Sequence, residues 1–281
     1  IFTPSDYKAS KEARLGYPVA VDPMIDLENG ELEMSQLQIG EFGRNFDSDF
    51  LALELPFIFC DHDHVARVLE GDIGQNMLSG LRDRSPVTGM AFTYSGGFRC
   101  VASDKALPSI EDLRGLKFAT LMNPVCVDTI NAFGAIPETF TVEDFNQKIS
   151  TEGLSADALE TTIPRFLAQL KHNSDKRYLV NTKHNIFLTT IIVSNKFLDT
   201  LDADTKLKFY QACQYAAKLE RQWSVDDAEN FAAQEDHSDI GVSYREITEE
   251  ETQTLKELSL PVIEKYRDFF SSGLVNNILN S

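Results

Sequence analysis

One stretch, from Asp202 to Gln234, contains neither proline nor glycine, and it constrains the fold more than any other feature of the chain. About 30 residues at 1.5 Å each make a helix roughly 45 Å long, which exceeds what one small domain needs. We therefore expect a helix that braces two lobes. The apolar residues predicted to form its buried stripe are Phe209, Cys213, Ala216, Ala217, Leu219 and Trp223.

Short apolar runs that resemble strands alternate with helical patterns along most of the chain, without a fixed-period repeat. This alternation favours an α/β fold with largely parallel sheets. Strands are predicted over 90–94, 98–102 and 116–121, the first two separated by the turn Ser95-Gly96-Gly97. A helix is predicted from Pro124 to Gly134, because proline is favoured just inside a helix start and glycine just past its end.

The composition excludes several classes of protein. The 281 residues include 26 Lys and Arg against 44 Asp and Glu, which gives a formal net charge of −18. A nucleic-acid-binding surface must be cationic, so neither nucleic acid nor an anionic membrane surface is an expected partner. No apolar run approaches the roughly 18 residues that cross a bilayer, and no membrane insertion is expected. The length favours two domains over one.

The densest group of potential metal ligands is Asp61-His62-Asp63-His64. At the predicted start of a helix such residues cap free amides, and no further ligands follow at a diagnostic spacing. We interpret the group as a helix cap and expect no metal site. The four cysteines, which show no CxxC spacing, are interpreted as buried thiols, with one disulfide as the alternative. They are Cys60, Cys100, Cys126 and Cys213.

No catalytic motif stands out in the sequence. The nucleophile motif G-x-S-x-G, the Walker motif and the dinucleotide fingerprint G-x-G-x-x-G are all absent, and the acidic residues are too numerous to single out a catalytic pair. We therefore expect no catalytic residues and no cofactor. Binding without chemistry is the leading class of function.

Arg99 is the basic residue that the pattern singles out, because it follows Gly96-Gly97 in an otherwise apolar strand. A charge there either faces solvent at a strand edge or points into a cleft, where its planar guanidinium holds a carboxylate through two parallel bonds. Charge-assisted bonds contribute about 1.5 to 3 kcal/mol each. One such pair supplies much of the ~8 kcal/mol that micromolar affinity requires.

Several segments, taken in order, resemble the extracytoplasmic solute receptors of tripartite ATP-independent periplasmic (TRAP) transporters, of the dicarboxylate-receptor type. The resemblance runs from about Gly30 to the C-terminal helices. The matching segments are Asn29-Gly30-Glu31-Leu32-Glu33-Met34, Glu54-Leu55-Pro56-Phe57-Ile58-Phe59, Gly71-Asp72-Ile73-Gly74-Gln75, Gly97-Phe98-Arg99, Ser109-Ile110-Glu111-Asp112-Leu113-Arg114-Gly115-Leu116-Lys117, Asn123-Pro124-Val125, Phe133-Gly134-Ala135 and Asp157-Ala158-Leu159-Glu160-Thr161.

The resemblance implies a two-lobed periplasmic-binding-protein fold with a long helix that spans both lobes. It implies a periplasmic receptor that closes over a small organic solute and delivers it to the membrane subunits of a TRAP permease. The expected boundaries are 1–97 for the first part of lobe I, 98–186 for lobe II, 187–225 for the return to lobe I with the first half of the long helix, and 226–281 for its second half, the return to lobe II and the C-terminal helices.

The resemblance also carries over site residues. Arg99 matches an arginine near the solute, Asn123 falls in a turn that lines the cleft, and Glu160-Thr161 matches a pair beside the ligand. Phe187 aligns with an aromatic wall of the cleft. The family's principal carboxylate-binding arginine corresponds to Ala119, a departure from the pattern.

An alanine at position 119 neither neutralises a carboxylate nor fills the volume of an arginine. Either the solute is not the usual acid, or another cation reaches the cleft. Arg165 and the segment Glu41 to Arg44 are the candidates, and surface charge is the alternative for both arginines. The vacated volume could admit an aromatic acid, a zwitterion or a polyol, and a solute with one carboxylate ranks first.

The sequence leaves alternatives for the N-terminal unit and for the function. The resemblance implies an N-terminal strand and helix that the sequence from Ile1 does not match, so either the sequence is truncated or that unit is supplied otherwise. As alternative functions we consider an α/β enzyme acting on a small organic acid, and a ligand sensor for a signalling partner. Turnover of a solute would favour the enzyme, whereas neighbouring genes for permease subunits would favour the receptor.

Overall fold

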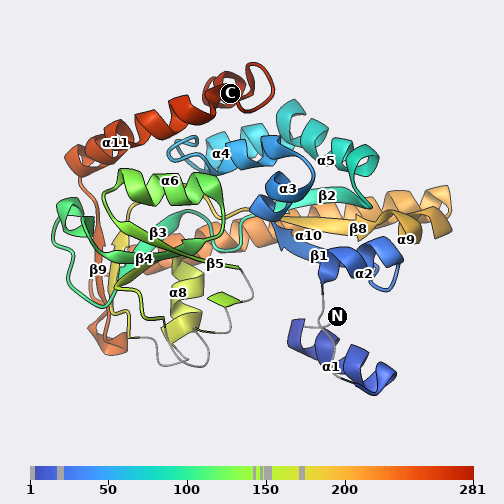
Figure 1. Ribbon diagram of the computed structural model, residues 1–281, viewed down its shortest axis with the longest axis horizontal. Helices are drawn as coiled ribbons and strands as arrows, with labels where there is room; N and C mark the ends of the chain where they lie inside the picture. Colours follow the sequence, from blue (N-terminus) through green and yellow to red (C-terminus); the bar gives the residue numbers. More distant parts are fainter. Residues whose placement is uncertain (1–3, 18–21, 142–143, 146–147, 149–153, 171–174) are drawn as a thin grey trace.

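The protein has two lobes, each built on its own β-sheet, and a long helix runs along both (Figure 1). A computed structural model describes residues 4–17, 22–141, 144, 145, 148, 154–170 and 175–281. Among these residues no helix combines the length and the apolar character needed to cross a membrane. The two-lobed α/β architecture predicted from the sequence is confirmed.

Helices and strands alternate along most of the chain. The α-helices are α1 (Pro4–Leu15), α2 (Pro23–Asn29), α3 (Ile39–Asn45), α4 (His62–Glu70), α5 (Asp72–Arg84), α6 (Pro124–Ala132), α8 (Ile163–Leu170), α9 (Asn195–Thr200), α10 (Ala203–Ala232), α11 (Glu249–Arg267) and α12 (Leu274–Leu279). The 3₁₀ helices are η1 (Ser48–Glu54), η2 (Ile110–Leu113) and η3 (Ser238–Ile240). The strands are β1 (Met34–Gln38), β2 (Val87–Thr93), β3 (Arg99–Ser103), β4 (Lys117–Leu121), β5 (Ile136–Phe140), β6 (Ala158–Thr162), β7 (Tyr178–Asn181), β8 (Thr189–Ser194) and β9 (Ser243–Glu246).

The first lobe contains a three-stranded sheet in the order β1-β8-β2. Strand β8 is antiparallel to both of its neighbours, with Gln36 opposite Ile191 and Phe92 opposite Thr190. The prediction of largely parallel sheets is therefore wrong for this lobe. The alternation of strands and helices had suggested parallel crossovers, but the central strand enters from the other lobe and runs against both neighbours.

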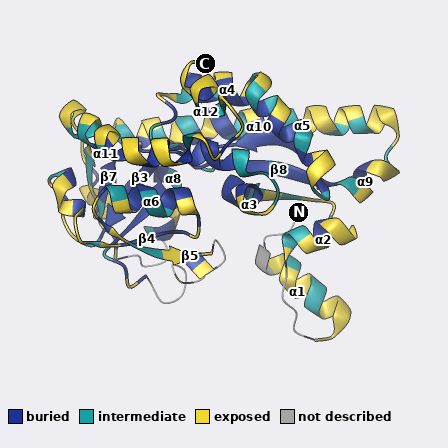
Figure 2. Ribbon diagram, turned by 45° about the horizontal axis from the view of Figure 1, so that its top comes forward, coloured by how far each residue is buried: buried dark blue, intermediate teal, exposed yellow. Residues whose placement is uncertain are grey.

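The second lobe contains a six-stranded mixed sheet in the order β5-β4-β6-β3-β7-β9. Strand β4 is parallel to β5 and β6, and β7 is parallel to β9, whereas β3 is antiparallel to both of its neighbours. Every residue of β3 and of β6 is buried, because the sheet is covered on both faces (Figure 2).

Two extended segments carry the chain between the lobes and pair with each other. The predicted turn at Ser95-Gly96-Gly97 links β2 of one sheet to β3 of the other, and all three residues have positive φ. Phe98 forms a β-bridge with Ile186 on the returning segment, and the Phe187 amide donates to the Gly97 carbonyl at 3.0 Å. The predicted strands on either side of the turn thus belong to different lobes.

Helix α10 has the predicted length and start, with the Asp202 side chain accepting from the Thr205 amide. It packs on β2 in the first lobe and on α8 in the second. The predicted buried stripe is partly wrong, since Ala216 and Trp223 are exposed. The residues buried instead are Cys213, Ala217, Arg221, Ser224 and Phe231.

Polar residues of α10 take these core-facing positions because they bind the backbone of the crossing segment. Glu220 accepts from the Tyr94 and Ser95 amides at 2.8 Å each, and the Ser224 hydroxyl accepts from the Gly96 amide at 3.0 Å. Arg221 donates to the Phe92 carbonyl at 2.8 Å. The middle of α10 therefore holds the backbone of the crossing segment from Tyr94 to Gly97, which we call the hinge, through hydrogen bonds.

The interpretation of Asp61 to His64 as a helix cap is confirmed, whereas the interpretation of the cysteines as buried thiols is wrong for Cys60. Asp61 caps α4 by accepting from the His64 amide at 2.7 Å, and no group of metal-ligating side chains occurs in the described part of the chain. Helix α6 begins at Pro124 behind the cap Asn123. All four cysteines are free thiols; three are buried as expected, while Cys60 is exposed.

Candidate functional site

The site forms where the two lobes meet, around the guanidinium of Arg99. Arg99 is the first residue of β3, and its side chain is only 1% exposed. Its Nη1 lies 3.0 Å from Glu160 Oε2 on β6, and its Nη2 lies 3.4 Å from Glu54 Oε1 at the end of η1. A cation from the second lobe thus joins one carboxylate of each lobe.

Glu54 is completely buried at this junction. Its carboxylate oxygens accept hydrogen bonds from the side-chain amides of Gln38 and Asn123. Burial raises the pKa of Glu54 to about 7, an effect that the Arg99 charge counters and the Glu160 charge reinforces. Burial therefore favours the protonated form of Glu54.

Glu160 has the opposite character. Burial alone would raise its pKa, but the Arg99 charge and contacts with His184 and Thr120 outweigh it and lower the pKa to about 2. His184 Nε2 lies 3.6 Å from Glu160 Oε2, and His184 Nδ1 lies 2.7 Å from the Thr182 hydroxyl. Burial lowers the pKa of His184, which favours its neutral form, and the Arg99 charge is the strongest influence that lowers the pKa of Glu160.

Two arginines contact the ring of Phe187. The guanidinium carbon of Arg99 lies 4.5 Å from the ring centroid, and that of Arg165 lies 4.7 Å from it. Arg165, on α8, also donates from Nη1 to the Ser95 hydroxyl at 3.2 Å, which ties it to the hinge. Burial and the nearby Arg99 charge lower the pKa of Arg165.

A small pocket opens beside these groups, with about 10 Å³ of enclosed space, which is room for about one water molecule. Its wall combines both arginines with a carboxylate, a hydroxyl and three apolar side chains. The lining residues are Arg99, Leu121, Phe145, Glu160, Thr161, Arg165 and Phe187. Such a wall can bind the anionic end of a small molecule and also its hydroxyl or apolar parts.

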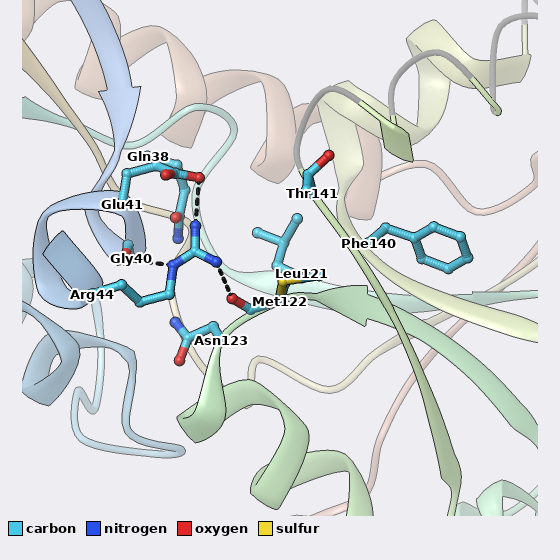
Figure 3. A pocket seen from close by; sticks show the side chains of 9 residues that line it. All are labelled: Gln38, Gly40, Glu41, Arg44, Leu121, Met122, Asn123, Phe140 and Thr141. Carbon is cyan, nitrogen blue, oxygen red and sulfur yellow. Dashed lines mark hydrogen bonds and ion pairs between the residues drawn. The ribbon is translucent and has the colours of Figure 1, made fainter. Parts of the chain in front are cut away.

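A second small pocket, with about 10 Å³ of enclosed space, lies next to it across Leu121. Figure 3 shows the Arg44 side chain between Glu41 of its own helix and the backbone at Met122. Arg44 Nη2 lies 2.7 Å from Glu41 Oε1, and Nη1 donates to the Met122 carbonyl. The lining residues are Gln38, Gly40, Glu41, Arg44, Leu121, Met122, Asn123, Phe140 and Thr141.

The structure brings most of the sequence-predicted site residues together. Arg99, Glu160, Thr161, Arg165 and Phe187 line the first pocket, and Glu41, Arg44 and Asn123 line the second. Of the two alternatives predicted for Arg99, the structure excludes a solvent-facing side chain: the guanidinium is buried, lies against two glutamates and lines the first pocket.

Ala119 lies apart from these two groups. It has no exposed surface and packs within the apolar cluster of the second lobe, together with Cys100, Leu159 and Phe145. Phe145 itself lines the first pocket. The region of position 119 is therefore occupied by apolar packing rather than by a second charge.

The sequence reasoning missed Glu54 and His184 as parts of the site. Glu54 is the first residue of the segment Glu54 to Phe59, and this segment contributed to the sequence analysis only through its resemblance to the family. A charge beside an apolar run, as at Arg99, was the signal that could have singled it out. Gln38 and Thr120 carry no comparable signal, because a neutral side chain in a strand is common on any surface.

The model of the bacterial extracellular solute-binding protein family 7 matches residues 20–268 of the chain. The chain belongs to this family. Membership confirms the resemblance to TRAP solute receptors and the predicted role of a solute receptor. It also agrees with the expected location outside the cytoplasm.

Among curated family members, the C4-dicarboxylate-binding periplasmic protein DctP of Rhodobacter capsulatus is 27% identical over 237 residues, which cover 84% of this chain and 69% of that protein. Its name supports the periplasmic location. The chain spans only 53% and 55% of the length of two further curated relatives, from Haemophilus influenzae and Verminephrobacter eiseniae.

Solved structures of family members share the fold. A TRAP periplasmic solute-binding protein from Shewanella oneidensis, with bound succinate, has a TM-score of 0.79 at 20% identity and covers 98% of this chain and 92% of its own. The sugar acid binding protein of Advenella mimigardefordensis, in complex with galactonate, has a TM-score of 0.80 at 20% identity, covering 92% of this chain and 81% of its own. At these identities the likeness concerns the two-lobed fold.

Proposed function

We propose that this chain captures a small carboxylate-bearing organic solute between its lobes and hands it to the membrane subunits of a TRAP permease. The observation that carries the proposal is the pair of arginines, Arg99 and Arg165, on one aromatic ring at the wall of the inter-lobe pocket. Guanidinium groups bind carboxylates through paired, charge-assisted hydrogen bonds. The similar proteins whose solutes are named bind organic acids: C4-dicarboxylates, succinate and galactonate.

In this proposal Arg165 provides the cation that the alanine at position 119 does not. Its guanidinium lies at the pocket, largely out of water, where the attraction for a carboxylate is screened less than at the surface. Thr161 and Glu160 would contact the polar groups of the solute, and Phe187 its flat or apolar face. The other side of the cleft would be formed by residues of the second pocket, namely Glu41, Arg44 and Asn123.

The delivery step follows from the way the lobes move. A solute held by groups from both lobes stabilises the closed form, and the closed form presents a different surface from the open one. A permease that recognises the closed surface then receives only loaded receptors. The chain itself needs no catalytic residue for this cycle.

A thermal-shift screen against organic acids, followed by calorimetry, tests the proposal. A bound acid raises the melting temperature because only the folded state binds it. Arg165→Gln should weaken binding of the acid found by about tenfold or more, the order expected for one charge-assisted bond. The matched control Arg114→Gln changes an exposed arginine on the same lobe and should leave the affinity unchanged. Equal affinities of the two variants would remove Arg165 from the site.

A further inference from the structure

Helix α10 carries an apolar stripe on the side that faces away from the core. Its two aromatic residues, Tyr215 and Trp223, are 66% and 61% exposed, and Ala212 and Ala216 are exposed beside them. Leu219 lies half-buried between the two aromatic residues. At about 100° per residue, all five side chains fall within roughly 100° of the helix circumference. A continuous exposed apolar surface rich in Trp and Tyr is typical of a protein–protein interface.

The charged residues at the two ends of this stripe have opposite signs. Lys208, whose side chain is 70% exposed, lies at the N-terminal end, whereas Asp226 and Asp227, both exposed, lie at the C-terminal end. The ion pair of Lys208 with Asp204, at 2.6 Å, is open to solvent and contributes little, so Lys208 remains able to bind another carboxylate. An antiparallel copy of the same helix would bring its acidic end to this lysine.

We propose that two copies of this chain associate through this face of α10, with the two helices antiparallel about a twofold axis. With the axis at the middle of the stripe, Trp223 of each helix lies on Ala212 of the other, and Leu219 lies on Ala216. A large side chain therefore faces a small one at each of these contacts, which lets the helices approach to about 8–10 Å. Each contact occurs twice, as a twofold-symmetric interface requires.

The same register brings Lys208 of each copy beside Asp227 of the other, because the two positions are equally far from the middle of the stripe. Size and charge thus specify one antiparallel register. A parallel arrangement would instead place the two lysines side by side, and likewise the acidic residues. This double match favours a second copy as the occupant, since an unrelated apolar partner would not require it.

The association competes with the repulsion between two chains of formal net charge −18. Salt at physiological strength screens this repulsion beyond about 8 Å. An interface of one helix face per copy is at the small end of stable interfaces, so the dimer should form reversibly as the concentration rises. Arg221 and Ser224 lie on the inward side of α10, so pairing leaves their hydrogen bonds to the backbone of Phe92 and Gly96 intact.

Sedimentation velocity of the chain in about 0.15 M salt tests the inference. Monomer should convert to dimer as the concentration rises from about 10 µM to about 1 mM, the range expected of a small reversible interface. Trp223 is the only tryptophan of the chain, so its fluorescence emission should shift to shorter wavelength over the same range as water leaves the indole. A chain that stays monomeric at the highest concentration would overturn the proposal.

Charge reversal tests the register. Lys208→Glu and Asp227→Lys should each raise the dissociation constant at least about tenfold, because each change alone puts like charges together twice. Mixed in equal amounts, the two variants should form a heterodimer about as tightly as the parent dimer, since every pair is then opposite in sign. Lys256→Glu, the same change at an exposed lysine of α11, is the control and should leave the dissociation constant unchanged.

Trp223→Gln should also weaken the dimer at least about tenfold, while the melting temperature of the dilute protein stays that of the parent because the side chain is exposed. A dimer that persists unchanged in Trp223→Gln and in Lys208→Glu would use another surface and would overturn the proposal, as would a mixture of the two charge variants that stays monomeric. If the chain is monomeric and Trp223→Gln instead loses capture by the membrane subunits of the permease, the face belongs to the permease and the proposal is wrong.

Discussion

Arg99 shows how one residue can couple the two lobes. Its guanidinium is withdrawn from water, and burial by itself would lower its pKa; the Glu160 and Glu54 charges more than compensate and keep the pKa above its ordinary value. A buried ion pair of this kind adds little net stability, but removing one partner leaves the other as an uncompensated charge. Replacing Arg99 therefore lowers the stability of the fold, whether or not Arg99 also binds the solute.

Arg99→Ala should lower the free energy of unfolding at pH 8 by about 3 to 5 kcal/mol, the range observed when one partner of a buried pair is removed. The variant leaves Glu54 and Glu160 buried without their cation, so the pKa values of both carboxyl groups rise above the unfolded value. Groups with raised pKa values destabilise the folded state at high pH, and the deficit should shrink as the pH falls from 8 to 5. Urea unfolding at both pH values measures it.

The control for this variant is Arg82→Ala. Arg82 is 43% exposed in its side chain and forms a surface pair with Asp199 at 2.7 Å, so its loss should change stability by less than about 1 kcal/mol at either pH. A deficit in Arg99→Ala that is as small as in the control, or that does not depend on pH, would contradict the description of the buried pair.

At the scale of elements, the hinge segment is held by helix α10 through backbone hydrogen bonds. One carboxylate, Glu220, accepts from two successive amides, Tyr94 and Ser95. The segment thus leaves the first sheet with its amides satisfied by a helix that belongs to both lobes. When the lobes open or close, the chain must therefore bend next to the hydrogen bonds that join Tyr94 and Ser95 to Glu220.

Glu220→Ala should release the hinge segment from α10. Hydrogen bonds to a charged group contribute about 1.5 to 3 kcal/mol, so the Tyr94 and Ser95 amides should exchange with solvent roughly tenfold to hundredfold faster. Hydrogen exchange followed by NMR measures this change. Gln222→Ala, an exposed position on the same helix, is the control. Unchanged exchange at the two amides would show that α10 does not hold the hinge.

Gly96 is the tightest point of the hinge. Its φ is +104°, and a Cβ there would lie 2.8 Å from Thr162 Cβ and closer still to Thr162 Oγ1. Gly96→Ala should therefore cost about 1 to 3 kcal/mol more than Gly115→Ala, because overpacking adds to the backbone strain. Gly115 has a similar positive φ of +76° with no atom within 4 Å of the added Cβ. Equal melting temperatures for the two variants would contradict this reasoning.

The sequence predicted well those helices whose ends are determined by neighbouring residues, such as a capping side chain, a proline or a glycine. The span of α10 follows from its Asp202 cap and from the lack of proline and glycine, and α6 follows from the order Asn123-Pro124 and Gly134. These signals act through neighbouring backbone groups and need no knowledge of tertiary structure.

The strand order and the exposed face of α10 were not predictable in this way. Two strands separated by a three-residue turn read as neighbours, yet they enter different sheets because the turn crosses between lobes. Trp223 is 61% exposed although its apolarity predicted burial, because Arg221 and Ser224 take the inward positions to bind the crossing segment. Partners distant in sequence decide both features.

The same limit applies to the site. Arg99 was recognisable because a charge in an apolar strand requires a partner, but its partners Glu54 and Glu160 lie 45 and 61 positions away along the chain from Arg99. The resemblance to the family supplied Glu160 and not Glu54. Only the packing of the lobes determines that both carboxylates share one guanidinium.

In the whole molecule, the lobes are joined not only by the buried network but also by a contact at the rim of the cleft. Arg44 of the first lobe donates to the carbonyl of Met122, where β4 of the second lobe ends (Figure 3). Glu41 holds the same guanidinium from its own helix. The contact can form only when the lobes are close together, so it favours the closed form.

Arg44→Ala should shift the molecule toward its open form. The side chain is 28% exposed, and the lost contact is expected to cost the closed form about 1 kcal/mol, or roughly fivefold in its population relative to the open form. The affinity for a solute acid should fall by a similar factor, mainly through faster release. Small-angle scattering of the solute-free protein should show a larger radius of gyration for the variant.

The control is Arg84→Ala, because Arg84 is an arginine, 48% exposed in its side chain, whose partner, Asp47 at 2.9 Å, lies in the same lobe. Its removal takes away an ion pair but no contact between lobes, so the radius of gyration and the rate of solute release should remain those of the parent protein. If the two variants change both quantities equally, the rim contact does not govern closure. In that case closure would depend on the buried network of Glu54, Arg99 and Glu160 and on the other contacts between the lobes.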